Sequence, residues 1–252
     1  MRPLFFVGNR RSGTSMFTMV LNEHHNIYMS LEADALWNVF AEGDMSVPPD
    51  DYSVHWDGWK TRRILNADSY LRYEQLEGTP REKFFQDILH IKDHGVEGRQ
   101  DPYPEKKDED LLWVGEKKPG VSSDPWIRAW MRDHFADAKY IHMVRNPRHC
   151  IGSMAKLNWG HGDIEFLTRY WIRLEEQAQD IPALRIRFED ASRDPWDAMR
   201  RVCDYLDLNV QAQNYNRDPN GQMITKRGTI LDNYTTTSDE WFERVPVTES
   251  LK

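Results

Sequence analysis

The chain has 252 residues, of which 39% are hydrophobic and 29% are charged. This composition excludes an intrinsically disordered chain, and the length is enough for one α/β domain with a substantial core. The formal net charge of −8 gives no support to a nucleic-acid-binding surface, although a local basic site can lie within an acidic exterior.

Cysteine content and hydropathy indicate the compartment. The sequence contains 2 cysteines, Cys150 and Cys203, both in segments typical of helices, so we expect no disulfide framework and a reducing environment. The apolar run at 4–7 is too short for the core of a signal peptide, and no later stretch approaches the ~18 apolar residues of a membrane span. We therefore expect a cytoplasmic protein that binds neither membrane nor nucleic acid. The sequence does not indicate an oligomeric state.

Strands and helices alternate along the chain. Residues 4–7 are predicted to form a buried strand that Gly8 ends, and residues 16–22 an apolar helix. Asp-Pro and Asn-Pro pairs mark later helix starts, because the first residue caps a helix and proline fits its first turn. The later predicted elements are a helix starting at 124–125, a strand at 139–144, a helix starting at 146–147, a strand at 184–188 and a helix starting at 194–195. This order predicts a single α/β domain over residues 1–252, with a central parallel β-sheet flanked by helices.

Three segments are less regular. Residues 95–110 are polar, with charges and two prolines, and are predicted to form a surface loop. The tail after about residue 235 is weakly patterned, and we expect it to be partly mobile. The aromatic residues within 55–73 fit either the lining of an acceptor pocket or a satellite core.

The segment between the first strand and the first helix is the most informative. Gly8, Gly13 and Ser15 have the spacing of the P-loop, in which backbone N–H groups and the positive end of a helix bind phosphate. We expect a phosphate to be bound by these N–H groups, by the hydroxyls of Thr14 and Ser15, and by Arg11. The alternative is that Gly13 makes only a tight turn and that the arginines beside it are solvated.

One departure from the P-loop pattern bears on the ligand. Thr14 stands where the P-loop has its lysine, and Arg145 follows the strand at 139–144 where a magnesium-binding aspartate would stand. P-loop NTPases use these two groups to handle a triphosphate. A small-molecule kinase with a degenerate loop is therefore a weaker alternative. A non-catalytic nucleotide-binding module is another, in which substitution of catalytic side chains would change nothing.

Residues 6–15 resemble the 5′-phosphosulfate loop of the sulfotransferases that use 3′-phosphoadenosine-5′-phosphosulfate (PAPS). In that family a strand is followed by proline, a basic residue, serine, glycine, threonine and a further hydroxyl residue. Here Arg10 replaces the proline, and the matching residues that follow are Arg11, Ser12, Gly13, Thr14 and Ser15. The resemblance implies a P-loop-NTPase-like sulfotransferase fold and metal-free transfer from PAPS to an acceptor hydroxyl, with 3′,5′-adenosine bisphosphate as product.

A second set of segments resembles the family's binding site for the 3′-phosphate. Residues 140–148 match the strand whose terminal arginine, with a serine eight residues later, binds that phosphate; the matching pair here is Arg145 and Ser153. Near the C-terminus, the signature of two basic residues and a glycine is matched, with the basic residues in swapped order, by Lys226, Arg227 and Gly228. The alternatives are a surface ion pair for Arg145 and an ordinary basic loop for residues 226–228.

The remaining resemblances concern residues 115–119 and 187–190. The first implies that Lys117 lies near the bridging oxygen of the donor, where a fixed cation stabilises developing charge. Lys118 is expected to be a solvated surface charge, with an exchange of roles between the two lysines left open. In the second segment Phe188 replaces a tyrosine, which removes a hydrogen bond to adenine and leaves stacking.

The family has two solutions for the general base. One is a histidine two residues after the lysine, and Pro119 occupies that position here. The other is a glutamate further along the chain from the loop, and Glu32 occupies that position, so Glu32 is the predicted base. The alternative is that Glu32 is a solvated carboxylate at a helix start that Ser30 caps.

The histidines predict no metal site. His90 and His94 are spaced i, i+4 but have no cysteine or third ligand nearby, so we predict that no metal is bound. His24 and His25 resemble a structural corner of the family. No motif within residues 32–110 identifies the acceptor, which stays open between a carbohydrate, a peptide and a small molecule.

Overall fold

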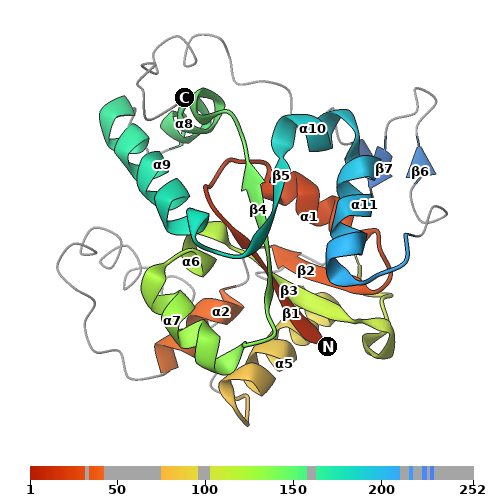
Figure 1. Ribbon diagram of the computed structural model, residues 1–252. Helices are drawn as coiled ribbons and strands as arrows, with labels where there is room; N and C mark the ends of the chain where they lie inside the picture. Colours follow the sequence, from red (N-terminus) through yellow and green to blue (C-terminus); the bar gives the residue numbers. More distant parts are fainter. Residues whose placement is uncertain are drawn as a thin grey trace.

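A five-stranded parallel sheet forms the centre of the protein (Figure 1). The computed structural model describes residues 1–31, 34–42, 75–95, 103–157 and 163–210, and the backbone of residues 216–217, 223–225 and 228–229. The strand order is β2-β3-β1-β4-β5. The strands are β1 (Arg2–Val7), β2 (Ile27–Leu31), β3 (Trp113–Lys117), β4 (Lys139–Val144) and β5 (Ala183–Arg187).

Helices cover both faces of this sheet. They are α1 (Thr14–Asn22), α2 (Ala35–Glu42), α5 (Pro80–His94), the 3₁₀ turn η2 (Asp108–Asp110), α6 (Pro119–Ser122), α7 (Pro125–His134), α8 (Pro147–Ala155), α9 (Ile164–Gln179), α10 (Phe188–Arg193) and α11 (Pro195–Leu206). A small antiparallel sheet is formed by β6 (Asn216–Arg217), β7 (Met223–Thr225) and β8 (Gly228–Thr229). The predicted fold class, a parallel sheet flanked by helices, is confirmed.

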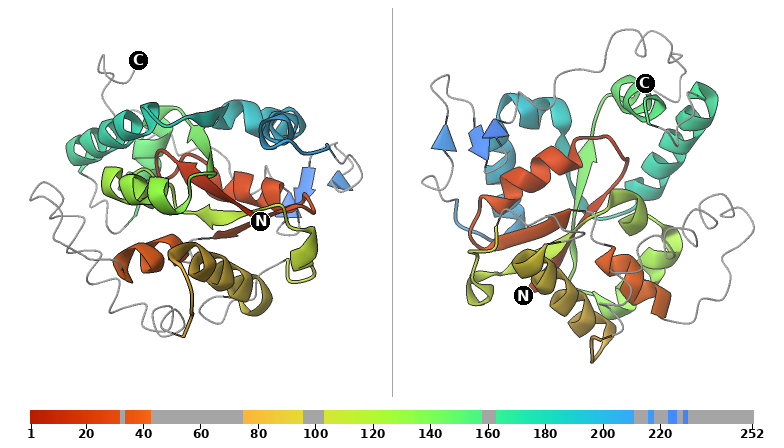
Figure 2. Two further views of the ribbon diagram at one scale, coloured as in Figure 1. Left: turned by 60° about the horizontal axis from the view of Figure 1, so that its bottom comes forward. Right: turned by 180° about the vertical axis from the view of Figure 1, so that it is seen from behind.

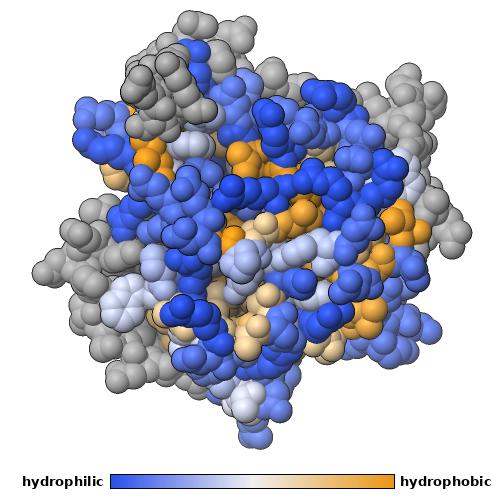
Figure 3. All heavy atoms as spheres, in the orientation of Figure 1, coloured by the Kyte–Doolittle hydropathy of each residue, from blue (hydrophilic) through white to orange (hydrophobic). Residues whose placement is uncertain are grey.

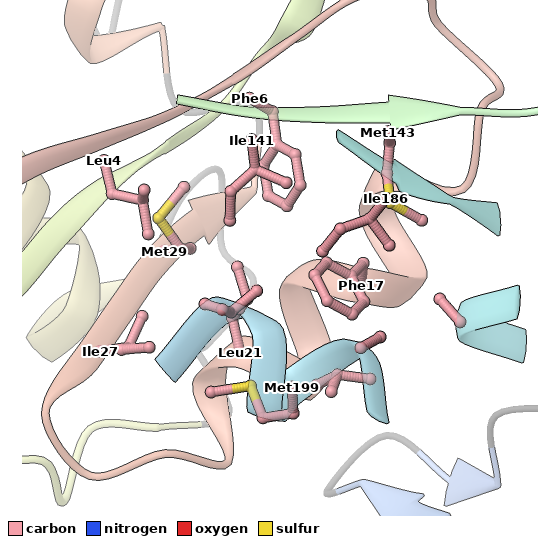
Figure 4. Packing of buried hydrophobic residues seen from close by; sticks show 14 of the residues in the cluster. Leu4, Phe6, Phe17, Leu21, Ile27, Met29, Ile141, Met143, Ile186 and Met199 are labelled. Atoms are coloured by element: carbon pink, nitrogen blue, oxygen red, sulfur yellow. The ribbon is translucent and has the colours of Figure 1, made fainter. Parts of the chain in front are cut away.

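Alternate residues of β1 pack on opposite faces of the sheet, as the period of two in a strand requires. Leu4 and Phe6 belong to the apolar cluster beneath α1 and α11, which Figure 4 shows from close by. Phe5 belongs to the cluster beneath α2, α5, α6 and α7. Figure 2 shows α2 and α5 on one side of the sheet and α11 on the other. Burial on both faces explains why β1 is a continuous apolar run.

Each helix start predicted from a proline pair is confirmed. The side chains of Asp124, Asn146 and Asp194 accept hydrogen bonds from first-turn N–H groups of α7, α8 and α11. The strand predicted at 184–188 is β5, but Phe188 already belongs to α10.

The structure corrects two local predictions. Ser30 is not a helix cap, because it lies fully buried within β2. The start of α2 is instead bound by Glu116 of β3, which accepts hydrogen bonds from the N–H groups of Asp34 (2.7 Å) and Leu36 (3.0 Å). The predicted surface loop is wrong in part, since Tyr103 is 2% exposed and packs in the core. Residues 96–102 of that loop lie outside the described residues.

Figure 3 shows a mainly hydrophilic face on which apolar side chains form separate small areas. Across the described helices, none combines the length and the apolar character that a membrane crossing requires. Cys150 and Cys203 are buried free thiols, and burial raises the pKa of Cys150 to about 12 and that of Cys203 to about 11. The prediction of one domain over 1–252 stays a prediction, and the tail after about 235 lies outside the described residues.

His24 is a structural residue in the fold, as the resemblance implied. Its Nδ1 accepts the N–H of Asn26 at 3.2 Å, so the proton is on Nε2, which lies 3.0 Å from the carbonyl oxygen of Asn209. The contact at Nδ1 needs a neutral ring, whereas the bond from Nε2–H to Asn209 also forms with a protonated ring and opposes the lowering of the pKa. Burial lowers the pKa of His24 below its ordinary value, and repulsion from His25 and Lys106 adds to this effect.

We predict a loss of stability on acidification. Because its pKa is lowered in the folded state, His24 stabilises the fold above about pH 6.5, and this contribution is lost as the pH falls below that value. The urea midpoint should fall between pH 7.5 and 5.5, and His24→Gln should flatten the slope. The control is His25→Gln at the exposed neighbour; an equal flattening there would contradict the assignment to His24.

Candidate functional site

The loop between β1 and α1 has a left-handed backbone at three positions. The φ angles of Gly8, Arg11 and Gly13 are 98°, 63° and 94°. A Cβ on Gly13 would lie 2.1 Å from Cδ2 of Phe188, so both the backbone and the available space require glycine. α1 begins directly afterwards with no side-chain cap from Gly13, which leaves the first N–H groups of the helix, at Thr14 and Ser15, for an anion.

Hydroxyl groups hold the shape of this loop. The Ser12 hydroxyl is buried and donates to the carbonyl oxygen of Asn9 at 2.7 Å. The N–H of Gly8 donates to Oγ of Ser123 at 2.7 Å, and that hydroxyl donates to Pro119 in α6 at 2.7 Å. The Ser12 side chain therefore braces the loop.

Arg145 and Ser153, the residues predicted to bind the 3′-phosphate, both contact Arg11 of the phosphate loop. Arg145 directly follows β4, and Ser153 lies in α8, as their spacing predicted. Nη1 of Arg145 donates to the carbonyl oxygen of Arg11 at 3.0 Å, and Nε of Arg11 donates to Oγ of Ser153 at 3.0 Å. The Phe188 ring lies 4.2 Å below the guanidinium of Arg145. Residues from three separate segments thus surround one point at the carboxyl edge of the sheet.

The charges at this point favour an anion. Burial lowers the pKa of the Arg145 guanidinium; Cys150 and Glu189 oppose this effect and nearby Arg11 adds to it. Burial and the charge of Arg145 also lower the pKa of His149 on α8. Positive groups held close together in partly buried surroundings repel one another, and a phosphate between them would relieve that repulsion.

The ends of β2 and β3 lie at the same edge. Lys117 is the last residue of β3, is 3% exposed, and pairs in register with Leu31, the last residue of β2. The prediction that Lys118 is a solvated surface charge is wrong: it is 6% exposed and forms an ion pair with the carboxylate of Asp34. A lysine buried in this way is stable because its charge is paired.

Several predicted residues lie outside the described part of the chain. Glu32, Lys226 and Arg227 are among them, and Gly228 is described only as part of the backbone of β8. Their roles stay predictions. In the described ranges no group of three or more His, Cys, Asp or Glu side chains is arranged to hold a metal ion.

A family model described as the sulfotransferase family matches residues 3–212. The chain belongs to the sulfotransferase family. The comparison with curated protein sequences gives no match.

Two solved structures share the fold of this sulfotransferase. The sulfotransferase domain from the Synechococcus PCC 7002 olefin synthase is 18% identical, with a TM-score of 0.56 over 100% of this chain and 90% of that chain. The sulfotransferase domain from the curacin biosynthetic pathway is 17% identical, with a TM-score of 0.54 over 100% of this chain and 95% of that chain. At these identities the likeness establishes the fold and leaves the substrates open.

Sequence reasoning missed several residues of this sulfotransferase that contact the loop or the strand ends. Glu116 lies beside Lys117 in a segment already identified by resemblance, so an unusual density of charge after an apolar strand was a usable signal. Ser123 and Glu175 contact Gly8 and Asn9 of the loop from positions that no local pattern marks.

We predict that Gly13→Ala disrupts the phosphate loop. The added Cβ clashes with the Phe188 ring, and the loop holds the alanine in a left-handed backbone conformation. The free energy of unfolding should therefore fall by about 1–3 kcal/mol, and anion binding should be lost. The matched control is Gly120→Ala, whose Cβ would find Nε of Arg10 at an ordinary 3.5 Å. Urea denaturation and calorimetry with adenosine bisphosphate measure both effects. Equal behaviour of the two variants would contradict the role of Gly13.

Proposed function

We propose that this sulfotransferase transfers a sulfuryl group from PAPS to an acceptor hydroxyl of a carbohydrate, a peptide or a small molecule. The observation that carries the proposal is the meeting of Arg11, Arg145 and Ser153 beside the N-terminus of α1. A nucleotide with phosphates at both its 3′ and 5′ positions needs two anion-binding groups close together. The loop and the Arg145–Ser153 pair meet that requirement.

In this proposal the two ends of the donor occupy different parts of the site. The 5′-phosphosulfate binds the backbone N–H groups of residues 11–15, with the hydroxyls of Thr14 and Ser15. The 3′-phosphate binds Arg145 and Ser153, joined by the C-terminal residues Lys226, Arg227 and Gly228. Phe188 is 7% exposed and already contacts Gly13 and Arg145, so its contribution is mainly to hold those two residues.

The transfer proceeds in line between two oxygens. The acceptor oxygen attacks sulfur while the bond from sulfur to the bridging oxygen of the 5′-phosphate breaks, and 3′,5′-adenosine bisphosphate leaves. Glu32 takes the proton of the acceptor hydroxyl, and Lys117 stabilises the charge that develops on the bridging oxygen. The pairing of Leu31 with Lys117 supports this assignment, because Glu32 follows Leu31 directly in the chain. A cytoplasmic location also belongs to the proposal, supported by the two free thiols.

We predict that Arg145→Ala weakens adenosine bisphosphate binding about 10- to 100-fold, the range expected for lost hydrogen bonds to a charged group. Isothermal titration calorimetry measures the dissociation constant. Arg193→Ala is the control, because Arg193 is 78% exposed on α10 and lies 3.7 Å from Asp190 in a surface ion pair. The donor assignment is wrong if the wild-type protein does not bind the nucleotide, or if Arg145→Ala binds it normally.

We predict that Glu32→Gln and Lys117→Ala bind the nucleotide but transfer sulfate at least about 100-fold more slowly, because proton removal and charge stabilisation each contribute by that order. The assay incubates the protein with sulfur-labelled PAPS and a cell extract and identifies the product that gains label. Glu165→Gln, at an 80% exposed site in α9, is the control. Unchanged transfer in both catalytic variants would overturn the proposed roles, and wild-type binding without any transfer would favour a non-catalytic module.

A further inference from the structure

Two residues of α9, Trp171 and Glu175, form hydrogen bonds with Asn9 of the phosphate loop. The side chain of Asn9 is fully buried, and its amide Nδ2 donates twice: to the carbonyl oxygen of Trp171 at 3.0 Å and to Oε1 of Glu175 at 2.7 Å. Figure 1 shows α9 beside the turn that leads from β1 into α1. These bonds give Asn9 a single amide orientation, because the oxygen of the amide could not replace Nδ2 between two acceptors.

The second oxygen of Glu175 faces the other side of the loop's first turn. Oε2 lies 3.2 Å from Nε2 of His142, a residue of β4 that is 1% exposed. The His142 ring packs directly against Gly8, where an added Cβ would lie 2.5 Å from Cδ2 of the ring. The Glu175 carboxylate therefore contacts the side chain of Asn9 and also His142, the residue that packs against Gly8.

A further hydrogen bond connects Asn9 with Ser12 within the loop. The carbonyl oxygen of Asn9 accepts the hydroxyl of Ser12, so the position of Asn9 helps to fix the turn that ends at Gly13. A carboxylate accepting an amide N–H makes a stronger hydrogen bond than a neutral acceptor. The negative charge of Glu175 would repel a bound phosphate, so its charge alone would weaken anion binding at the loop.

We propose that Glu175 is a positioning residue that holds the phosphate loop in its donor-binding conformation through Asn9 and His142. The inference rests on the proposed function, because it takes the loop as the site of the donor's 5′-phosphate. Glu175 acts without touching the donor. Its effect is on the shape of the free loop, so its loss should raise the KM for PAPS more than it lowers kcat.

The test uses Glu175→Ala, Glu175→Gln, Asn9→Ala and the double variant Asn9→Ala/Glu175→Ala in the full chain. Hydrogen–deuterium exchange of the amides of residues 8–15 reports the loop without any ligand. Calorimetry with adenosine bisphosphate and steady-state kinetics with PAPS report its effect on the donor. The matched control is Glu176→Ala, at the exposed next residue of the same helix.

We expect Glu175→Ala to raise loop exchange, the dissociation constant and the KM each about tenfold, with kcat changed less than about twofold, because one charge-assisted bond is lost. Glu175→Gln keeps an oxygen for Asn9 and should stay within about threefold of the wild type. The losses in the double variant should be smaller than the sum of the losses in the two single alanine variants, since both single variants break the bond between Asn9 and Glu175.

Two results would overturn the proposal. One is a Glu175→Ala protein that matches Glu176→Ala in both exchange and affinity, and the other is additive losses in the double variant. Should Glu175→Ala fail to fold, Asn9→Ala and Glu175→Gln carry the same comparison. A wild-type protein that does not bind adenosine bisphosphate would refute the donor assignment alone, because the exchange data would still decide whether Glu175 orders the loop.

Discussion

The close contact between Gly13 and the Phe188 ring is the constraint on which the site depends. No atom fits between the backbone of the loop and that ring, so the start of α1 is fixed against the junction of β5 and α10. Arg145 lies over the same ring, with its guanidinium 4.2 Å from the ring centroid. A single aromatic side chain thus sets the spacing between the two groups proposed to bind the two ends of the nucleotide.

Charge is distributed around this frame in a consistent way. Arg11 and Arg145, the groups proposed to face the donor, carry like charges, and Arg11 adds to the lowering of the Arg145 pKa that burial mainly causes. The charges behind them are satisfied within the protein: Glu116 binds the start of α2, and Lys118 pairs with Asp34. The candidate site therefore combines a support whose charges are paired within the protein with two arginines on the side proposed to face the donor.

Features encoded by neighbouring residues could be predicted from the sequence. The loop, the helix starts at Asp124 and Asn146, and the relation of Arg145 to Ser153 depend on short spacings, and the structure has them where the pattern indicated. Features that depend on distant residues could not be predicted. The local sequence indicates a helix start capped by Ser30, where the structure has β2, and the group that binds the start of α2 is Glu116, 82 positions away from Asp34. The burial of Lys118 likewise depends on that partner and not on its local sequence.

The bond between Asn9 and Glu175 has a consequence for the order of events during synthesis. These residues are 166 positions apart, so the ribosome must complete α9 before the loop can acquire all of its contacts. The loop therefore leaves the ribosome well before α9 does, and it acquires its last contacts only once α9 has emerged. Long-range contacts of this kind form late because closing so long a stretch of chain is entropically costly.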